Sequence, residues 1–470
     1  MAIKYKVHRI FEGDMMDKIQ LLEARKAAIM EAGKEIREQI STLVDAESFV
    51  ELSAFSFSKN TFAETEVAGE GVVTGFATVD GYPFYIVGQN FKVLQGGISK
   101  ANCDKIVKCM DTAAKDETPI IYLLNTYGVQ VGEGVGVLEG LGKLLLRASQ
   151  LKGVVPQYVI VNGEVYGSVA ALAAAADAVM FIEKKSVLAL NSPFVLSAKE
   201  GKNLTKEEVG GVKALSKTGL FSISVESMEE AKEKIVAHYD VLAARMLEAD
   251  LNGSLPALNE AATAENMLSV FDSYIELGSA NCSCVKTMLG RIGGISVAAI
   301  LFDGGEDSVE IKACNLAKIR SFIEYVGCQS LPLVVFANVK GVAPTMCANN
   351  SRVMKEVVEY LEYLDTLDAG KISVIYGKAI GLGYTLFASK SVGFDYTCAF
   401  ANAKVALFDS VQGAQIELGV EGVDKAAVAT KYADENADPF NAAQGGYIDA
   451  IIEPQFVRQY LIASLQMLVK

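Results

Sequence analysis

Two glycine-rich turns are the parts of this chain best suited to do chemistry. Asn162 to Ser168 follows the apolar run Pro119 to Asn125, and Tyr376 to Gly383 follows the similar run Pro332 to Asn338. From the proline of the run to the first glycine of the turn is 44 positions in the first case and 45 in the second. Each turn is predicted to open a helix, whose first backbone N–H groups have no partner within the helix and can hold an anion. Two such turns indicate a reaction that stabilises two developing oxyanions.

Other residue types with catalytic or metal-binding chemistry are scarce. The chain has two histidines, His8 and His238, and both are expected at the surface. A Ser–His–Asp or Cys–His site therefore lacks its usual base, and a histidine-ligated metal site is not expected. Eight cysteines occur without a CxxC pair, so no metal site is predicted, and all eight are expected to be reduced and mostly buried. The glycine run Gly132 to Lys143 matches neither phosphate-loop pattern.

Backbone amides are thus the predicted catalytic groups. One preorganised donor in a dry site stabilises an oxyanion by roughly 3–4 kcal/mol. A structural interpretation of each turn remains open, because glycine also lets a helix pack closely on a strand, and a duplicated fold would repeat such glycines. The matched spacing favours the oxyanion interpretation without excluding the structural one.

The composition is that of a globular protein with an ample core. Of 470 residues, 51% are hydrophobic and 21% are charged, which allows two domains of about 200 residues each. No run of 18 residues is free of charge, and the first residues lack the apolar stretch of a secretory signal. A cytoplasmic protein without a transmembrane segment is therefore expected. The net charge of −14 and the lack of a basic stripe argue against nucleic-acid binding.

The segments around the turns alternate between helix and strand patterns. In the first half we expect a helix over 14–43, a hairpin that turns at Asp80-Gly81, a helix over 105–115, strands from Pro119 and over 155–161, an Ala-rich helix over 169–176 and a strand over 177–182. In the second half we expect strands over 296–302, 332–338 and 372–376 and helices over 312–327, 352–367 and 384–390. This alternation predicts parallel α/β sheets and an internal duplication.

A polar stretch separates the two halves. Residues 226–249 are predicted to form a charged helix, and 250–266 form a polar connector. The predicted domains are therefore 1–250 and 251–470.

Several segments resemble motifs of the biotin-dependent acyl-CoA carboxyltransferases. Asp45 to Leu52 is similar to D-P-G-S-F-V-E-L, Gly69 to Gly75 to G-D-G-V-V-T-G, Gln89 to Gly97 to Q-D-F-T-V-F-G-G, Lys105 to Asp111 to K-I-V-K-V-M-D, Lys378 to Tyr384 to K-A-Y-G-G-A-Y, and Asn436 to Pro454 to N-P-Y-x-A-A-x-R-G-Y-I-D-x-V-I-x-P. The family includes β subunits of propionyl-CoA carboxylase and α subunits of methylmalonyl-CoA and glutaconyl-CoA decarboxylases.

The resemblance runs from about Arg37 to the end and implies two tandem crotonase-like domains (a ββα superhelix). It implies an enzyme subunit that moves a carboxyl group between biotin and an acyl-CoA, with the acyl-CoA in the N-terminal domain and biotin in the C-terminal one. Carried over by position, the amides of Gly167 and Ser168 would hold the thioester oxygen, those of Leu382 and Gly383 would hold the ureido oxygen of biotin, and Tyr127, Gly128, Tyr166 and Thr385 would contact the substrate.

The resemblance also implies partners. The chain has no A-M-K-M biotinylation motif, so biotin would arrive on a separate carrier protein, accompanied by a biotin carboxylase or by membrane decarboxylase subunits. The family pattern is a hexamer with sites between the N-terminal domain of one chain and the C-terminal domain of another.

The chain departs from the family at three places. Asn125 to Gln130 stands where the family has D-S-G-G-A-R, Asn338 to Val342 replaces D-V-P-G-F, and no histidine follows Gly210-Gly211. An assembly subunit with impaired catalysis, or another acyl-CoA enzyme of the crotonase superfamily, therefore remains an alternative. A hydratase or isomerase is disfavoured because Ala171 stands where those enzymes carry a catalytic glutamate. The acyl group and the direction of transfer stay open.

Overall fold

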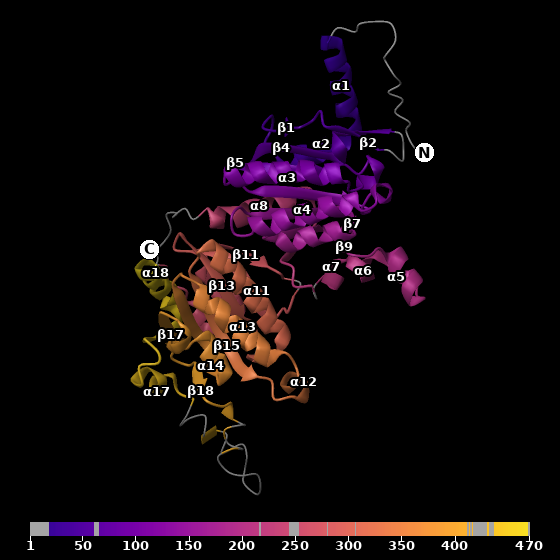
Figure 1. Cartoon of the computed structure of the whole chain (residues 1–470). Helices are drawn as coiled ribbons and strands as arrows, with labels where there is room; N and C mark the ends of the chain where they lie inside the picture. The colour runs from indigo at the N-terminus through magenta and orange to yellow at the C-terminus, as the bar shows by residue number, and fades with distance from the viewer. Residues whose placement is uncertain are drawn as a thin grey trace. The chain divides into compact units, whose positions relative to one another are not determined.

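The computed structural model describes residues 18–60, 65–215, 218–243, 253–279, 281–305, 307–410, 413, 416, 430–431 and 437–468. The chain divides into two compact units, Met1–Val236 and Ala237–Lys470 (Figure 1). The division falls inside helix α8 (Met228–Leu242), whereas the sequence placed the boundary after residue 250. Residues 244–249 of the predicted charged helix, residues 14–17 of the predicted first helix, and His8 lie outside the described residues.

The first unit begins with two helices, α1 (Lys18–Ala32) and α2 (Lys34–Leu43), where the sequence predicted one. The break falls at Gly33, which is also the N-cap of α2. Helix α2 buries Ile36 and Ile40 at helical spacing, and both approach Gly88 of the sheet closely enough that a Cβ there would lie 2.8 Å from Ile36 Cγ1. The helix is thus held by its apolar stripe.

An eight-stranded sheet forms the centre of the first unit. Its order is β1 (Val50–Leu52), β4 (Val72–Val79), β5 (Tyr82–Gln89), β6 (Ile120–Thr126), β7 (Gln157–Tyr166), β8 (Ala178–Ile182) and β10 (Ser222–Val225), and β9 (Val187–Ala189) pairs with the end of β7. From β5 onward the strands are parallel, as predicted, while β1, β4 and β5 are antiparallel. The predicted Asp80-Gly81 hairpin is confirmed, with φ angles of 52° and 78° that suit a type I′ turn.

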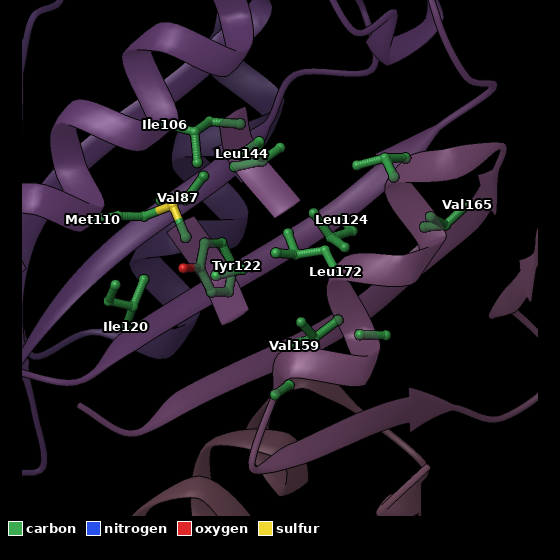
Figure 2. Packing of buried hydrophobic residues seen from close by; sticks show 14 of the residues in the cluster. Val87, Ile106, Met110, Ile120, Tyr122, Leu124, Leu144, Val159, Val165 and Leu172 are labelled. Carbon is green, nitrogen blue, oxygen red and sulfur yellow. The ribbon is translucent and has the colours of Figure 1, made fainter. Parts of the chain in front are cut away.

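Helices cover this sheet, and apolar side chains fill the space between. The helices are α3 (Lys100–Lys115), α4 (Gly136–Leu151), the 3-10 helix η4 (Ser168–Ala175), α5 (Pro193–Glu200), α6 (Lys206–Gly210), α7 (Val212–Leu215) and the start of α8. A separate ribbon consists of β2 (Phe57–Asn60) and β3 (Thr65–Ala68). Figure 2 shows Ile106 and Met110 of α3 and Leu144 of α4 beside Val87 and Tyr122 of the sheet. The apolar run at 119–125 is buried because helices and neighbouring strands enclose it.

The second unit repeats this plan around a nine-stranded sheet. Its order is β11 (Ser273–Leu277), β12 (Val285–Ile292), β13 (Ile295–Phe302), β15 (Leu333–Val342), β16 (Lys371–Ile380), β17 (Tyr396–Phe400) and β19 (Ala450–Ile452), with β14 (Val309–Ile311) on β15 and β18 (Lys404–Ala406) on β16. Its helices are α9 (Ala257–Glu260), α10 (Ala264–Met267), α11 (Ala313–Gln329), α12 (Met346–Asn349), α13 (Val353–Thr366), α14 (Leu382–Phe387), α17 (Pro439–Gln444) and α18 (Val457–Leu468). Across the described residues, no helix has the length and apolar character needed to cross a membrane.

One packing detail occurs in both units and confirms the predicted internal duplication. The register between β6 and β7 shifts next to Asn125, and that between β15 and β16 shifts next to Asn338. A Cβ on Gly163 would lie 2.6 Å from Asn125 Oδ1, and one on Gly377 would lie 2.4 Å from Asn338 Oδ1. Only glycine fits opposite either asparagine. The first glycine of each turn thus has a structural role, but it is packing of one strand against the next and not the predicted packing of a helix on a strand.

Two predictions about single residue types are corrected. His238 was expected at the surface, but it is fully buried, and its Nε2 lies 3.2 Å from the hydroxyl of Tyr325 on α11. Burial lowers the pKa of His238 to about 3. The cysteines were expected to be mostly buried, yet Cys314 and Cys328 are exposed. Neither outcome could be deduced from the helix on which the residue lies, because both depend on what that helix packs against.

Candidate active site

The first turn connects β7 to η4 through Gly167. Its φ of 88° and ψ of −171° are a conformation that side-chain-bearing residues avoid. A Cβ on Gly167 would lie 3.7 Å from the Cα of Gly128, and a Cβ on Gly128 would lie 3.4 Å from the carbonyl oxygen of Tyr166. Glycine on both sides thus lets the loop after β6 lie directly against the turn after β7. The structure brings together the predicted site residues Gly128, Tyr166 and Gly167.

Backbone hydrogen bonds decide which amides of this turn are open. The N–H of Gly167 donates to the carbonyl of Ala189 at 3.2 Å, and the N–H of Ala170 donates to the carbonyl of Gly167 at 3.0 Å. Between them, the N–H groups of Ser168 and Val169 have no hydrogen-bond partner within the described part of the chain. The open donors are therefore those of Ser168 and Val169. The predicted use of the Gly167 amide stays a prediction, and it would compete with Ala189.

The second turn has the same hydrogen-bond pattern. Gly381, with a φ of 54°, donates its N–H to the carbonyl of Ala406 at 2.9 Å, and the N–H of Thr385 donates to the carbonyl of Gly381 at 3.2 Å. The intervening amides include those of Leu382 and Gly383, for which the described residues provide no partner. Each unit therefore presents consecutive unpaired N–H groups at the carboxyl end of a buried strand, which is the arrangement that binds an oxyanion.

The side chains of the second turn differ in how tightly they are held. A Cβ on Gly383 would lie 2.8 Å from Val339 Cγ1, so packing of α14 on β15 requires glycine there. Leu382 is half-buried, while Thr385 is exposed, with its hydroxyl 3.4 Å from the carbonyl of Gly381. The structure brings Leu382, Gly383 and Thr385 onto one short helix, α14, which begins at Leu382 and not at the predicted residue 384.

A polar cluster that the sequence did not indicate lies next to the first turn. Glu164 accepts hydrogen bonds from the hydroxyls of Tyr166, at 2.7 Å, and Tyr127, at 3.4 Å, and from Lys206 Nζ at 2.5 Å. Burial alone would raise the pKa of Glu164, but the bonds from Lys206 and Tyr166 outweigh it and hold that pKa below its ordinary value. The rings of Tyr127 and Tyr166 are 6.1 Å apart. Glu164 and Lys206 are 42 positions apart, so no local pattern could reveal the pair.

A cavity of about 260 Å³ opens beside Gly128. Its lining includes Leu94, Gln95, Tyr127, Gln130 and Glu133. The backbone of Leu94 and Gln95 is left-handed, with φ of 49° and 56°, which is a strained conformation for residues with side chains. Strain of this kind often accompanies function. The cavity therefore belongs to the candidate site, although the sequence indicated only Tyr127, Gly128 and the departure at Gln130.

Comparison with known proteins gives matches over nearly the whole chain. The carboxyl transferase domain model matches residues 30–470. The α subunit of methylmalonyl-CoA decarboxylase from Veillonella parvula is 27% identical, over 97% of this chain and 96% of that subunit. A putative propionyl-CoA carboxylase β chain from Bacillus subtilis is 28% identical, over 92% of this chain and 90% of its own.

Comparison with solved structures agrees with the predicted fold. The crystal structure of transcarboxylase 12S, a hexamer with methylmalonyl-coenzyme A and methylmalonic acid bound, superposes with a TM-score of 0.88 at 22% identity, over 97% of this chain and 96% of that one. The predicted α/β fold of two tandem domains is confirmed. With the family model matched over nearly its whole length, this chain belongs to the carboxyl transferase domain family.

Proposed function

We propose that this chain is the carboxyltransferase subunit of a biotin-dependent acyl-CoA carboxylase or decarboxylase. The family match over residues 30–470 supports the reaction class. The observation that carries the proposal is the pair of turns, each with consecutive amide donors that the fold itself does not use. Carboxyl transfer passes through an enolate of the thioester, and a backbone donor stabilises such an oxyanion without a proton change.

Each of the two turns would hold a different substrate oxygen. The amides of Ser168 and Val169, with Gly167 placing them, would hold the thioester oxygen as negative charge develops on it. The amides of Leu382 and Gly383 would hold the ureido oxygen of biotin. Biotin, bound to a separate carrier protein, supplies the carboxyl group or accepts it. The residues of the chain thus position the two substrates and polarise the thioester and ureido carbonyl groups, and the proposal needs no histidine base.

The residues around the first turn would determine which acyl groups bind there. Tyr127, Tyr166 and Gly128 border the approach to the amides, and among the described residues the cavity next to Gly128 is lined by Glu133 but by no lysine or arginine. An acyl group that carries a second carboxylate would find no cation there to replace its hydration. Thr385, at the second turn, is proposed to contribute to acyl-chain preference.

Assembly belongs to the proposal as well. We infer a hexamer, by likeness to transcarboxylase 12S, with a biotin carrier protein and either a biotin carboxylase or membrane decarboxylase subunits as partners in the cytoplasm.

The test is carboxyl transfer by the purified chain. A panel of acyl-CoA and carboxyacyl-CoA thioesters is incubated with free biotin or a biotinylated carrier domain, and radiolabelled carboxyl transfer is followed in both directions. Transfer with at least one thioester is expected. Binding of CoA in a thermal-shift titration without any transfer would favour the alternative of an assembly subunit, and the absence of both would refute the proposal.

A further inference from the structure

A buried lysine fixes the loop that precedes β12. Lys318 of α11 is 7% exposed, and its Nζ donates to the carbonyls of Asn281 at 2.8 Å and Val285 at 2.6 Å. Asn281 lies in the loop and Val285 is the first residue of β12, so the ammonium group holds the part of the loop between them against α11. Charge-assisted bonds in a buried setting keep this junction rigid.

The same junction gathers three cysteines. Cys282 and Cys284 lie in the loop that Lys318 holds. Cys314 lies one helical turn before Lys318 on α11, and therefore on the same face. Burial and the neighbouring thiol of Cys314 together raise the pKa of Cys282. The fold thus brings two thiols from elements 32 positions apart in the sequence into the same neighbourhood.

The first unit has the same frame without the thiols. Lys105 of α3 donates to the carbonyls of Gly69 and Val72 at 2.8 and 2.7 Å, in the way that Lys318 does 213 positions later. The same offset relates Cys282 to Gly69 and Cys314 to Ala101. The frame therefore holds without a thiol at either place.

The backbone makes Cys282 an unexpected residue. Gly69 has a φ of 58°, and Cys282 has a φ of 43°, so both adopt the left-handed conformation that favours glycine. A side chain retained at such a position costs stability, and strain of this kind often accompanies function. Within the described residues, no group of three or more His, Cys, Asp or Glu is placed to hold a metal ion. Two neighbouring thiols, one of them exposed, are suited to thiol redox chemistry.

We propose that Cys282 and Cys314 form a reversible disulfide when the protein meets a low-molecular-weight disulfide such as oxidised glutathione. Cys314 is exposed, so it meets the reagent first, whereas burial raises the pKa of Cys282 to about 12. The Cys314 thiolate attacks one sulfur and releases one glutathione. The Cys282 thiolate then attacks the sulfur of Cys314 and releases the second. Two electrons pass to the reagent, and the two cysteine protons end on the two released thiols.

The disulfide would affect the part of the sheet that lies next to the second turn. Cys314 follows β14 closely, and β14 pairs with β15 at Gly341 and Val342. A Cβ on Gly341 would lie 3.9 Å from the amide nitrogen of Leu382, so little space separates β15 from that turn. Resting on the proposed function, we expect the disulfide to lower the rate of carboxyl transfer several-fold by displacing the Leu382 amide.

Peptide mapping tests the disulfide directly. The full chain is incubated with oxidised glutathione, alkylated and digested with trypsin without reduction, and the linked peptides are identified by mass spectrometry. The expected product joins the peptide Ala313 to Lys318 to the one that ends at Lys286 and disappears on reduction. Because Cys282 and Cys284 share the second peptide, the link must persist in Cys284→Ser and vanish in Cys314→Ser.

Cys328 is the matched control, because it is exposed on the same helix. Cys328→Ser should leave the link intact. Glutathione adducts on Cys314 and Cys328 without an internal link would overturn the proposal, as would a link that requires Cys284. In the transfer assay, the oxidised wild type should slow down and oxidised Cys314→Ser should not, and an unchanged rate in a linked protein would overturn the coupling to the second turn. Mapping needs no activity, so a chain inactive before oxidation counts against the proposed function alone.

Discussion

Substitution of Gly167 by alanine is the sharpest test of the first turn. Gly167 has a φ of 88° and a ψ of −171°, a region essentially restricted to glycine, where a residue with a side chain is disfavoured by roughly 1–3 kcal/mol. The new methyl group has room in the folded chain, since only the Cα of Gly128 lies within 4 Å, at 3.7 Å. The variant should therefore fold. Its turn will relax toward a less strained φ, which rotates the following amide of Ser168 away from its present direction.

The expected loss follows from the value of one oxyanion-hole donor. A misdirected donor removes roughly 3–4 kcal/mol of transition-state stabilisation, or about 10²–10³ in rate. The thioester must also pass the methyl group, which would lie between Gly167 and Gly128. Carboxyl transfer at saturating and at low acyl-CoA separates the two effects, because loss of a transition-state donor lowers kcat, whereas obstruction of binding raises KM.

Gly201→Ala is the control for strain alone. Gly201 ends α5 in the left-handed conformation, with a φ of 67° and a ψ of 23°, and a Cβ there would meet no atom within 4 Å, so alanine incurs a conformational cost, smaller than that at Gly167, far from the turn. Both variants should lose stability, and only Gly167→Ala should lose activity. If Gly167→Ala transfers carboxyl groups at the wild-type rate, the first turn is structural and the oxyanion assignment is wrong.

Three further predictions concern other parts of the molecule. His238 has a pKa of about 3 in the folded chain and about 6.5 when unfolded, so its contribution to stability is full above pH 6.5 and is lost as the pH falls toward 3. Urea unfolding at pH 7.5 and 5 should show a drop about 2 kcal/mol smaller in His238→Gln than in the wild type, and equal drops would contradict the buried neutral ring. Leu382→Gly should raise biotin-dependent transfer if the leucine narrows the biotin channel, whereas no change, or a loss from about 1 kcal/mol of helix destabilisation, would show that the channel is open. Specific activity should fall on dilution below the dissociation constant of the oligomer, and a fully active monomer in light scattering would refute shared sites.

Local patterns in the sequence were sufficient for most of the fold. The apolar runs at 119–125 and 332–338 lie in strands β6 and β15, and the second glycines of the turns, Gly167 and Gly381, do precede helices. Strand ends were placed less well, since β7 continues past Gly163 to Tyr166. The reason is that Gly163 meets Asn125 in the neighbouring strand, a contact across 38 positions that continues the pairing.

Features that depend on distant contacts could not be predicted in this way. His238 lies on a helix with many charged residues, and its burial, with the hydroxyl of Tyr325 beside it, depends on tertiary packing. Glu164 has no special sequence context, and its partners come from a loop and a helix on either side. The exposed Cys314 likewise gains significance only from the loop that Lys318 holds beside it. In each case the role of the residue depends on a partner that lies far away in the sequence, so neighbouring residues in the sequence could not reveal it.

The duplication itself indicates where substrate preference must arise. Both units place consecutive open amides after a left-handed glycine whose own N–H is bonded to a short parallel strand, at Ala189 in one and Ala406 in the other. Because the two arrangements of backbone amides are so similar, the amides alone cannot distinguish a thioester from biotin. The discrimination must therefore come from the side chains around it, which differ: Tyr127, Tyr166 and a cavity at the first turn, Leu382 at the second. Exchanging the side chains around a turn should change what that turn binds, while altering its glycine should weaken stabilisation of the oxyanion at that turn.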